Sequence, residues 1–543
     1  MNSVDLKKIV VSHPIRTLAF ALVVVWIFFG KSLPVICTDG SRLATIESLV
    51  HRGTFDISES MFISTCDKFR VPAHGENGKY YSDKPPVLSM VGAAAYFVSK
   101  FFGLDFRKDL PVLYRLIDFV LVILPILLTL YWMNLYLNAH QIRPEIQFWV
   151  CLAAVFGTLV LPYAMVIQNH VAAAAALLGA YIYLENPMKI KTLKALSLSG
   201  LLLGLGISMD LNMVFFAGTF TLVCLWYHAR SERTACISFL VLEAIPVALT
   251  WYFFWLITGE WKPFVSQVEK FFYAGSTLPK INFMGGYDST PLTMTDYGIY
   301  LWQALLGYKG LFSHSIALAL GFWGAILLLR KRDKLSLHLA AVVIAIVALL
   351  GFLMIAVPIT YGGSNFGFRY MTIWMPLIML FAAFLFREKG VLPMFQVIIG
   401  LSILTSSAGL ASPWLIHKFK QLDLDTFDFL LVADEASNPY FQLDKTIGSQ
   451  PEIPKLKANL TRENLIKLAF LHYQMVRPTE ALGYLQLLGD SDPEGNCYSA
   501  IIFSKRGLNL EDLMNKHVAK CPPEMWKELS DKMGLNEVKE PSK

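Results

Sequence analysis

The sequence predicts an all-α integral membrane protein. Of its 543 residues, 55% are hydrophobic and only 16% are charged, whereas charged residues make up about a quarter of a soluble domain. The mean hydropathy is +0.49, and the apolar residues are gathered into long runs. The net charge of +6 mostly reflects lysines and arginines held on the cytoplasmic side of a membrane. It does not indicate a nucleic-acid partner.

Apolar runs long enough to cross a hydrocarbon core of about 30 Å predict about eleven transmembrane helices. The first run, from about Ile15 to Ile36, follows basic residues and has no small-residue cleavage site, so we expect a retained helix; a signal peptide is the alternative. The runs begin near residues 15, 111, 145, 170, 195, 211, 236, 313, 337, 370 and 391.

The distribution of basic residues predicts the topology. Residues 87–103 are one further apolar stretch, which we place at the outer membrane interface, because all the basic clusters then fall in cytoplasmic connections. The amino terminus is then cytoplasmic, and the outward-facing parts are 37–110, the turn at 163–170, 258–312, 361–370 and the tail. The basic clusters are Arg143, Lys189/Lys191/Lys194, Arg230/Arg233, Arg330 to Lys334 and Arg387/Lys389.

Four of the seven cysteines fall in the predicted outer parts. We expect disulfides Cys37–Cys66 and Cys497–Cys521, as suits an oxidising compartment. Four free thiols are the alternative.

The composition divides the chain into a transmembrane domain, 1–411, and a small helical extracytoplasmic domain, 412–543. In the second domain Thr461 can cap a helix, and Thr479 can start another that ends at Gly489. The resulting hairpin, 461–489, is similar to a single tetratricopeptide unit, which cannot bury its own apolar face. A scaffold role and the docking of a partner protein both remain open for the tail.

The stretch from Thr38 to Pro86 carries too many charges for lipid to cover. Asp39 can act as a general base at the bilayer surface, or it can cap a helix that starts near Ser41. Lys84 precedes two prolines that preset the next helix, and it can neutralise a phosphate or snorkel at headgroup level.

Several segments in a fixed order resemble one family over about the first 410 residues. These are Asp39, Arg42 and Glu47, the run from Gly78 to Pro86, Arg115-Leu116, GLLLGLGI from Gly200, GYKGLF from Gly307 and YGGSNFGFRY from Tyr361. They resemble the protein O-mannosyltransferase and aminoarabinose transferase group of GT-C glycosyltransferases.

The resemblance implies a polyprenyl-phosphate sugar as the donor and inverting transfer on the outer membrane face to a glycolipid, a polysaccharide or a protein. It implies Asp39 as the catalytic base and Lys84 and Arg369 as ligands of the carrier phosphate. Arg369 also follows a glycine-rich turn and enters the next helix at its positive end; anchoring that helix at headgroups is the alternative. The further substrate-binding candidates are Arg42, Tyr81, Asp83, Arg115, Lys309 and Tyr370.

Two positions depart from the family pattern. Where aminoarabinose transferases carry an acidic residue after the third span, this chain has Asn169-His170, and Asp210 stands where they often have a basic residue. Asp210 could supply a second catalytic carboxylate, or His170 could act as a hydrogen-bond donor or a metal ligand; a structural role for His170 is the alternative. His74 and Asp83 could join His170 in holding a divalent metal, but the spacing matches no ligand pattern, and we predict no metal or other cofactor.

Two rival functions remain. A lipid-linked-sugar transporter or flippase should show repeated halves with charges at mid-membrane depth, and the sequence has no such repeat. An outer-face scaffold that recruits partners through its tail is the other. For the enzyme we expect a bacterial inner membrane, with the carboxy-terminal domain in the periplasm.

Overall fold

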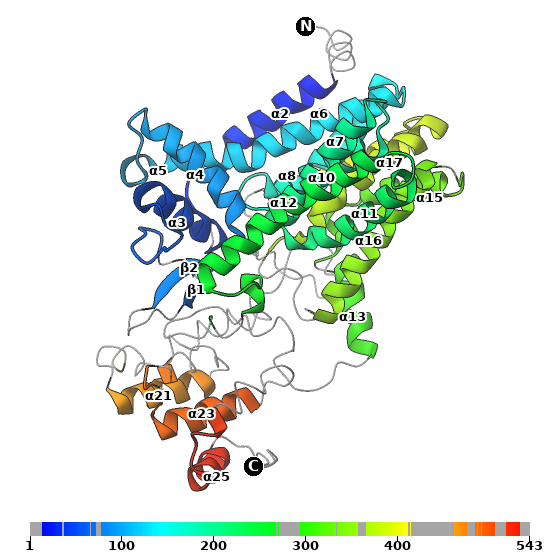
Figure 1. Ribbon diagram of the computed structural model, residues 1–543. Coiled ribbons are helices and arrows are strands. Elements are labelled where there is room, and N and C mark those ends of the chain that lie inside the picture. Colours follow the sequence, from blue (N-terminus) through cyan, green and yellow to red (C-terminus); the bar gives the residue numbers. More distant parts are fainter. Residues whose placement is uncertain are drawn as a thin grey trace.

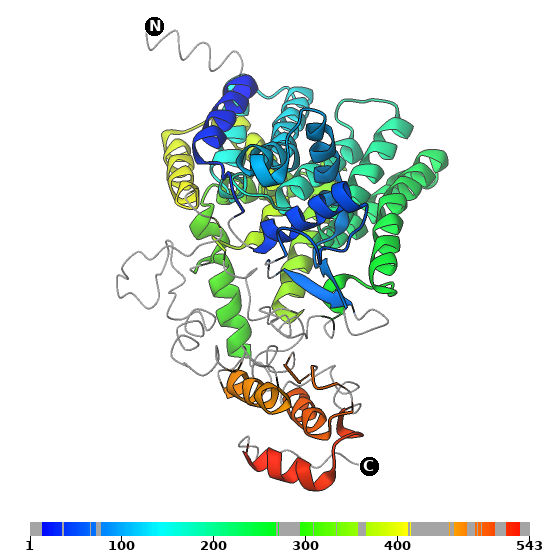
Figure 2. The ribbon, with the colours of Figure 1, turned by 90° about the vertical axis from the view of Figure 1, so that its left-hand side faces the viewer.

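The computed structural model is an almost entirely helical protein, as predicted. It describes residues 14–34, 37–63, 65, 67–71, 78–267, 270, 294–307, 309–332, 334–356, 365–410 and 413, and in the tail 456, 461–474, 484–485, 487–489, 491–504 and 517–532. Figures 1 and 2 show a bundle of packed helices, with the start of α2 at one end of the molecule and the described tail helices at the other.

The predicted apolar runs each coincide with a helix. Six helical segments in the described part are long and apolar enough to cross a membrane, and five more are apolar but shorter. The longest combines α5 (Phe106–Asp118), the π-helix η1 (Phe119–Ile123) and α6 (Leu124–Ala139). The other apolar helices are α2 (Pro14–Phe29), α7 (Pro144–Phe156), α9 (His170–Glu185), α10 (Thr192–Met209), α11 (Val214–His228), α12 (Arg233–Thr258), α15 (Leu318–Leu329), α16 (Lys334–Ala356), α17 (Met375–Lys389) and α18 (Pro393–Ser407). The short elements between them are α8 (Val160–Tyr163), the 3-10 helices η2 (Leu211–Met213), η3 (Phe264–Ser266) and η6 (Arg369–Trp374), α13 (Met294–Leu305) and α14 (Leu311–His314).

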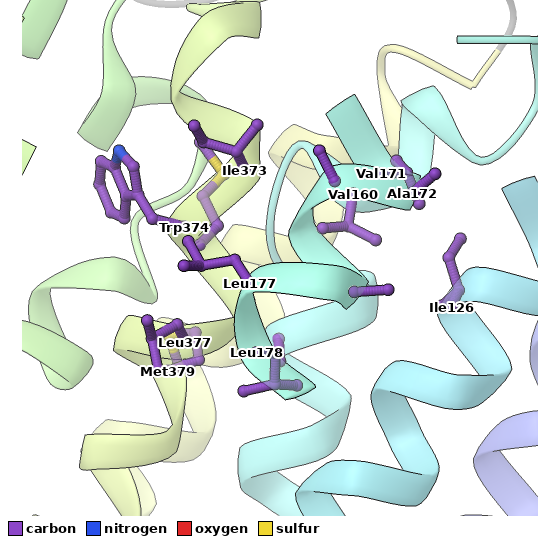
Figure 3. Close-up of a cluster of buried hydrophobic side chains, with 14 of the residues drawn as sticks. Ile126, Val160, Val171, Ala172, Leu177, Leu178, Ile373, Trp374, Leu377 and Met379 are labelled. Atoms are coloured by element: carbon purple, nitrogen blue, oxygen red, sulfur yellow. The ribbon is translucent and has the colours of Figure 1, made fainter. Parts of the chain in front are cut away.

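Helix α9 lies at the centre of the bundle. Its side chains are buried along nearly its whole length, and they pack between α6 on one side and η6 with α17 on the other (Figure 3). Small residues, Ala172 to Ala176, make this close packing possible because they let neighbouring helices approach. The position of His170, the first residue of α9, is therefore fixed by the core.

Helices α10 and α12 make a second close contact. A Cβ atom added at Gly200 or Gly204 would lie 2.2 Å from the backbone oxygen of Phe239 or Glu243, respectively. Only glycine fits at these two positions, because real Cβ atoms do not approach a backbone oxygen so closely. The contact holds α10, and with it Asp210 at its end, against the neighbouring helix.

The first predicted outer loop is a structured layer. It contains α3 (Cys37–Arg52), a hairpin of β1 (Lys68–Val71) and β2 (Lys79–Ser82), and α4 (Pro86–Lys100). The strands are antiparallel, with Lys68 opposite Ser82; the hairpin was not predicted. Helix α4 starts at Pro86, as expected, and it exposes Phe97 and Val98, which suits the predicted interfacial position.

Polar groups gather at two opposite ends of the bundle. His170 is the first residue of α9 and Glu185 the last, about 22 Å apart at a rise of about 1.5 Å per residue. At the Glu185 end, His140 lies 3.4 Å from Glu185, and Lys331 lies 3.4 Å from Glu388. We call this the basic end, because contacts bring the connections 139–144, 186–192, 229–232, 330–332 and 387–393 to this end of the bundle.

The described tail consists of α21 (Arg462–Gln474), α23 (Pro493–Ser504) and α25 (Pro523–Lys532). Thr461 caps α21 as predicted, since its Oγ1 accepts a hydrogen bond from the Asn464 amide at 3.3 Å. Of the predicted second helix, Tyr484 and Leu485 are helical and Gly489 has a φ of +81°; residues 479–483 lie outside the described part.

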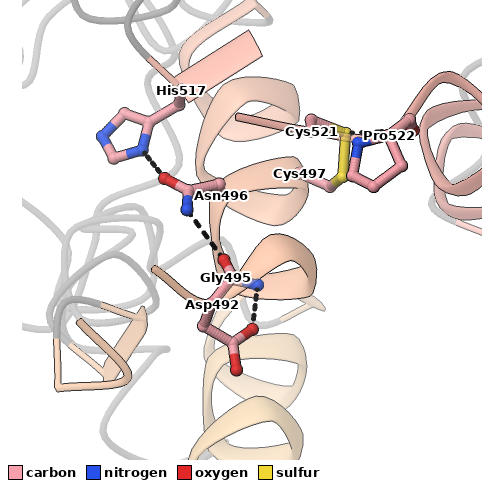
Figure 4. The surroundings of a disulfide bond; sticks show 7 residues. All are labelled: Asp492, Gly495, Asn496, Cys497, His517, Cys521 and Pro522. Atoms are coloured by element: carbon pink, nitrogen blue, oxygen red, sulfur yellow. Dashed lines mark hydrogen bonds between the residues drawn. A yellow bond between two sulfur atoms is a disulfide. The ribbon is translucent and has the colours of Figure 1, made fainter. Parts of the chain in front are cut away.

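The predicted disulfide Cys497–Cys521 is present (Figure 4). It ties α23 to the segment that leads into α25. Beside it, His517 is hydrogen-bonded to Asn496 at 2.7 Å, so a polar contact supports the same junction. The other predicted disulfide, Cys37–Cys66, stays a prediction, because Cys66 and the side chain of Cys37 lie outside the described part of the chain.

Candidate active site

Asp39 is completely buried in the first turn of α3. The helix starts at Cys37 and not near Ser41, so the expectation that Asp39 caps it is wrong. A carboxylate in the first turn is stabilised by the helix dipole. Its Oδ2 accepts a hydrogen bond of 3.0 Å from Tyr114 of α5, which joins α3 to the helical bundle.

Arg42 lies one turn further along α3 and is 1% exposed. Its Nη2 donates to Asn169 Oδ1 at 2.7 Å, and its Nη1 donates to the Thr38 backbone oxygen at 3.3 Å. Burial lowers the pKa of Arg42 to about 10, whereas the nearby carboxylates act to raise it. The charged groups that interact with Arg42 are Asp39, Asp67, Arg369 and Asp210.

Lys84 is held between two carboxylates. Its Nζ lies 2.6 Å from Asp67 Oδ2 and 3.2 Å from Asp83 Oδ2. Burial lowers the pKa of Lys84, Asp67 acts to raise it, and the cations Arg42 and Arg369 act to lower it further. Lys84 is therefore a cation within electrostatic range of two arginines, an arrangement that favours a bound anion.

The β-hairpin places these carboxylates. Because Lys68 pairs with Ser82, the residues just outside the pair, Asp67 and Asp83, come together at the end of the hairpin. Ser41 of α3 fixes the same end, since its hydroxyl lies 2.5 Å from that of Ser82 and 2.6 Å from the Asp67 backbone oxygen.

Arg369 is the first residue of η6, at the amino-terminal end of a helical segment, as predicted. Gly367 just before it has a φ of +63°, and a Cβ atom there would meet Leu159 at 2.7 Å, so the turn requires glycine. The guanidinium lies over the Tyr370 ring at 5.3 Å. Residues 361–364 of the glycine-rich turn lie outside the described part.

His170 and Asp210 are direct partners, joined through His170 Nδ1 and Asp210 Oδ2. Both are buried, at 5% and 4% exposure. The imidazole ring meets the Tyr370 ring edge to face, with centroids 5.7 Å apart, and it interacts with the charges of Arg369 and Arg42.

Seven groups from distant parts of the chain thus meet at one end of the bundle. We call them the site cluster, which consists of Asp39, Arg42, Asp67, Lys84, His170, Asp210 and Arg369.

Lys309 lies near the site cluster but is engaged with the chain. It is 5% exposed, donates to the Asn365 backbone oxygen, and lies 3.2 Å from the Asn365 Oδ1 atom. Burial and then the charge of Arg369 lower the pKa of Lys309 to about 7. Because its ammonium is held by Asn365 and is only partly protonated near pH 7, Lys309 is a weaker candidate for phosphate binding than its charge alone suggests.

Two of the predicted binding residues lie apart from the cluster. Arg115 donates to the backbone oxygens of Ile27 and Gly30 at 3.3 Å each, so it anchors α5 to the end of α2. Tyr81 stacks on Phe69, with ring centroids 5.9 Å apart. It belongs to the apolar cluster that joins the hairpin to α12.

Sequence reasoning missed Asp67 and Tyr114. Asp67 carried no helix or motif signal, and only the strand pairing brings it to Lys84. Tyr114 stands one residue before the Arg115-Leu116 pair, and its helical position on the inward face of α5 could have indicated a buried partner. Neither residue could have been matched to Asp39 or Lys84 without the fold.

Among the described residues, no group of three His, Cys, Asp or Glu side chains is arranged to hold a metal. His74 lies outside the described part. Asp83 is paired with Lys84 and His170 with Asp210, so these two do not form a ligand set with each other.

The sequence matches no family model and no curated protein. In structure the chain is similar to a crystal structure of ArnT from Cupriavidus metallidurans bound to undecaprenyl phosphate, with a TM-score of 0.47 and 15% identity over 86% of this chain and 74% of that chain. A likeness of this degree says nothing about substrates, so the function has to be argued from the site cluster.

Proposed function

We propose that this protein is a membrane glycosyltransferase that moves a sugar from a polyprenyl-phosphate donor to an acceptor, with inversion at the anomeric carbon. The observation that supports this most directly is the meeting of a buried carboxylate, Asp39, with Lys84 and Arg369 around Arg42. A reaction that deprotonates a nucleophile and releases a phosphate requires both kinds of group.

In the proposed reaction Asp39 accepts a proton from the acceptor hydroxyl or amine as that group attacks the anomeric carbon. The bond between this carbon and the phosphate oxygen breaks on the opposite face, and the prenyl phosphate leaves as an anion. Lys84 and Arg369 stabilise the negative charge that develops there. Arg369 offers a planar fork of donors for phosphate oxygens, and Lys84 offers a point charge.

The positive-inside rule supports an orientation for this reaction. The basic end of the bundle carries the connections rich in lysine and arginine, and such connections are retained in the cytoplasm. The site cluster lies at the other end of α9, so the proposed transfer takes place on the outer face. In a bacterium this is the periplasmic face of the inner membrane, where a disulfide such as Cys497–Cys521 persists.

The proposal is tested with purified protein in proteoliposomes, a panel of polyprenyl-phosphate sugars and candidate acceptors, with products identified by mass spectrometry. We expect one donor to be consumed and a glycosylated acceptor to form. Asp39→Asn should abolish product formation. Asp56→Asn is the matched control, since Asp56 pairs with Lys79 outside the site cluster.

Full turnover by Asp39→Asn would contradict the assignment of the base. Movement of the lipid-linked sugar across the bilayer without any glycosidic product would favour the flippase alternative.

A further inference from the structure

We propose that His170 and Asp210 act as one unit that donates a proton to the leaving prenyl phosphate. The inference rests on the proposed glycosyl transfer and assigns to its leaving group a partner other than Lys84 and Arg369. It also gives the two departures from the family pattern, His170 and Asp210, a single explanation.

The first observation is the direct contact between the two side chains. Asp210 Oδ2 is bonded to His170 Nδ1, and Asp210 Oδ1 accepts a hydrogen bond of 3.1 Å from the Asn212 amide. The carboxylate is thus oriented by the turn after α10. A carboxylate on Nδ1 fixes the tautomer and orientation of an imidazole and stabilises its protonated form. Asp210 is therefore a positioning residue, not a second independent base.

The second observation concerns the other ring nitrogen. Within the described part of the chain, His170 Nε2 makes no hydrogen bond. The ring contacts Asp210 and Tyr370, the backbone amide donates to Gln168, and Arg369 and Arg42 act on the ring through their charges. With Nδ1 engaged by Asp210, Nε2 is the atom that remains for a ligand.

The third observation is the charge around the ring. The charged groups that interact with His170 are Asp210 from the end of α10, Arg42 from α3 and Arg369 from η6. The two arginines oppose a positive charge on His170, whereas Asp210 favours it. A phosphate bound between the arginines would cancel their effect, so proton uptake by His170 is coupled to the arrival of the anion.

The step balances in atoms and charge. The bond between the anomeric carbon and the phosphate oxygen breaks, and its electron pair stays on the phosphate. The proton on His170 Nε2 moves to a phosphate oxygen, so the prenyl phosphate leaves as a monoanion and His170 becomes neutral. The proton from the acceptor resides on Asp39. After product release, Asp39 loses its proton to water and His170 takes one from water.

The test measures the binding of sugar-free polyprenyl phosphate to full-length protein in nanodiscs, at pH values from 5.5 to 9. For the wild-type protein we expect affinity to fall as the pH rises, because the hydrogen bond from protonated His170 is lost. His170→Gln should bind about tenfold more weakly than wild type at the acid end, the value of one charge-assisted hydrogen bond, and should lose this pH dependence. Asp210→Asn should shift the same dependence to lower pH.

The control is His338→Gln, which replaces another buried histidine, on α16 toward the basic end. It should bind with the wild-type pH profile. Thermal unfolding of each variant identifies any that fail to fold, and His170→Asn then replaces His170→Gln as the second variant.

The outcomes separate the two proposals. If His170→Gln keeps the wild-type affinity and pH profile, or if Asp210→Asn leaves the profile unchanged, the His170–Asp210 unit is wrong and the glycosyltransferase stands. If the wild-type protein binds no polyprenyl phosphate at any pH, the proposed function is wrong as well.

Discussion

Tyr114 donates a hydrogen bond of 3.0 Å to Asp39, a residue 75 positions earlier in the chain. Both side chains are fully buried, so the pair is a fixed point between α3 and α5. The Tyr114 hydroxyl also lies 3.5 Å from the Ile167 amide, three residues before His170. The Tyr114 hydroxyl therefore links Asp39, the candidate base, to the turn that precedes His170, the candidate acid.

Tyr114→Phe is expected to lower kcat/KM about 10- to 100-fold, because a hydrogen bond to a charged group contributes roughly 1.5–3 kcal/mol. The Asp39 carboxylate should remain in place but lose its orientation. Kinetics in proteoliposomes measure the effect, with Tyr136→Phe as the control, since Tyr136 is an equally buried tyrosine on α6. Equal losses in both variants would mean that Tyr114 only fills space.

Lys84→Gln is expected to destabilise the protein by about 3 kcal/mol, because it leaves Asp67 buried without its cation. The double variant with Asp67→Asn should recover much of this stability, since the unpaired carboxylate is then absent. It should not recover activity, because the phosphate would still lack one of its two proposed cations. Thermal unfolding in detergent and product formation measure the two effects separately, and an active double variant would remove Lys84 from the mechanism.

The low pKa of Lys309 should make the free energy of unfolding depend on pH. Its pKa is about 7 in the folded protein, below the value of about 10.4 for an unfolded chain. Between these values the unfolded state binds more protons, so stability should rise as the pH rises from about 7 to 10. Below about pH 7 both states are protonated, and Lys309 should add no further pH dependence. The melting temperature of Lys309→Met should lack this slope, and an identical slope in both proteins would refute the assignment.

Gly204→Ala is expected to destabilise the bundle by about 1–3 kcal/mol, because the added methyl group meets the backbone oxygen of Glu243. Gly218→Ala is the matched control, since a Cβ atom at Gly218 meets nothing within 4 Å. That control should be neutral or stabilising, because alanine favours a helix over glycine. Since Asp210 directly follows α10, a shift of this helix should also displace Asp210. Gly204→Ala should therefore lower activity more than the loss of stability alone would.

Replacing Cys497 and Cys521 by serine is expected to cost the tail roughly 3 kcal/mol, from loop-closure entropy across 24 residues. Limited proteolysis should then cleave near α23 and α25 at lower protease concentration than in wild type. The melting of the helical bundle should not change, and a loss there would show that the tail supports the membrane part.

The sequence predicts those features that depend on local pattern. Apolar runs locate the helices, and the two prolines after Lys84 locate the start of α4. The order of the charged segments between the spans predicts Asp39, Lys84 and Arg369 as candidate site residues. The Asp67–Lys84 pair could not be predicted, because it depends on strand pairing between segments with no strong periodicity. Nor could the packing of Tyr81 against aromatic residues or the burial of Lys309 against Asn365 be predicted, since both depend on which elements become neighbours.

The antiparallel pairing of Lys68 with Ser82 has a consequence for sequence change in this region. Inserting or deleting a single residue within either strand would turn alternate side chains to the opposite face, and Asp67 and Asp83 would no longer flank Lys84 together. Tolerance to length variation should therefore be low inside the two strands, even though neither contains a group assigned to the chemistry.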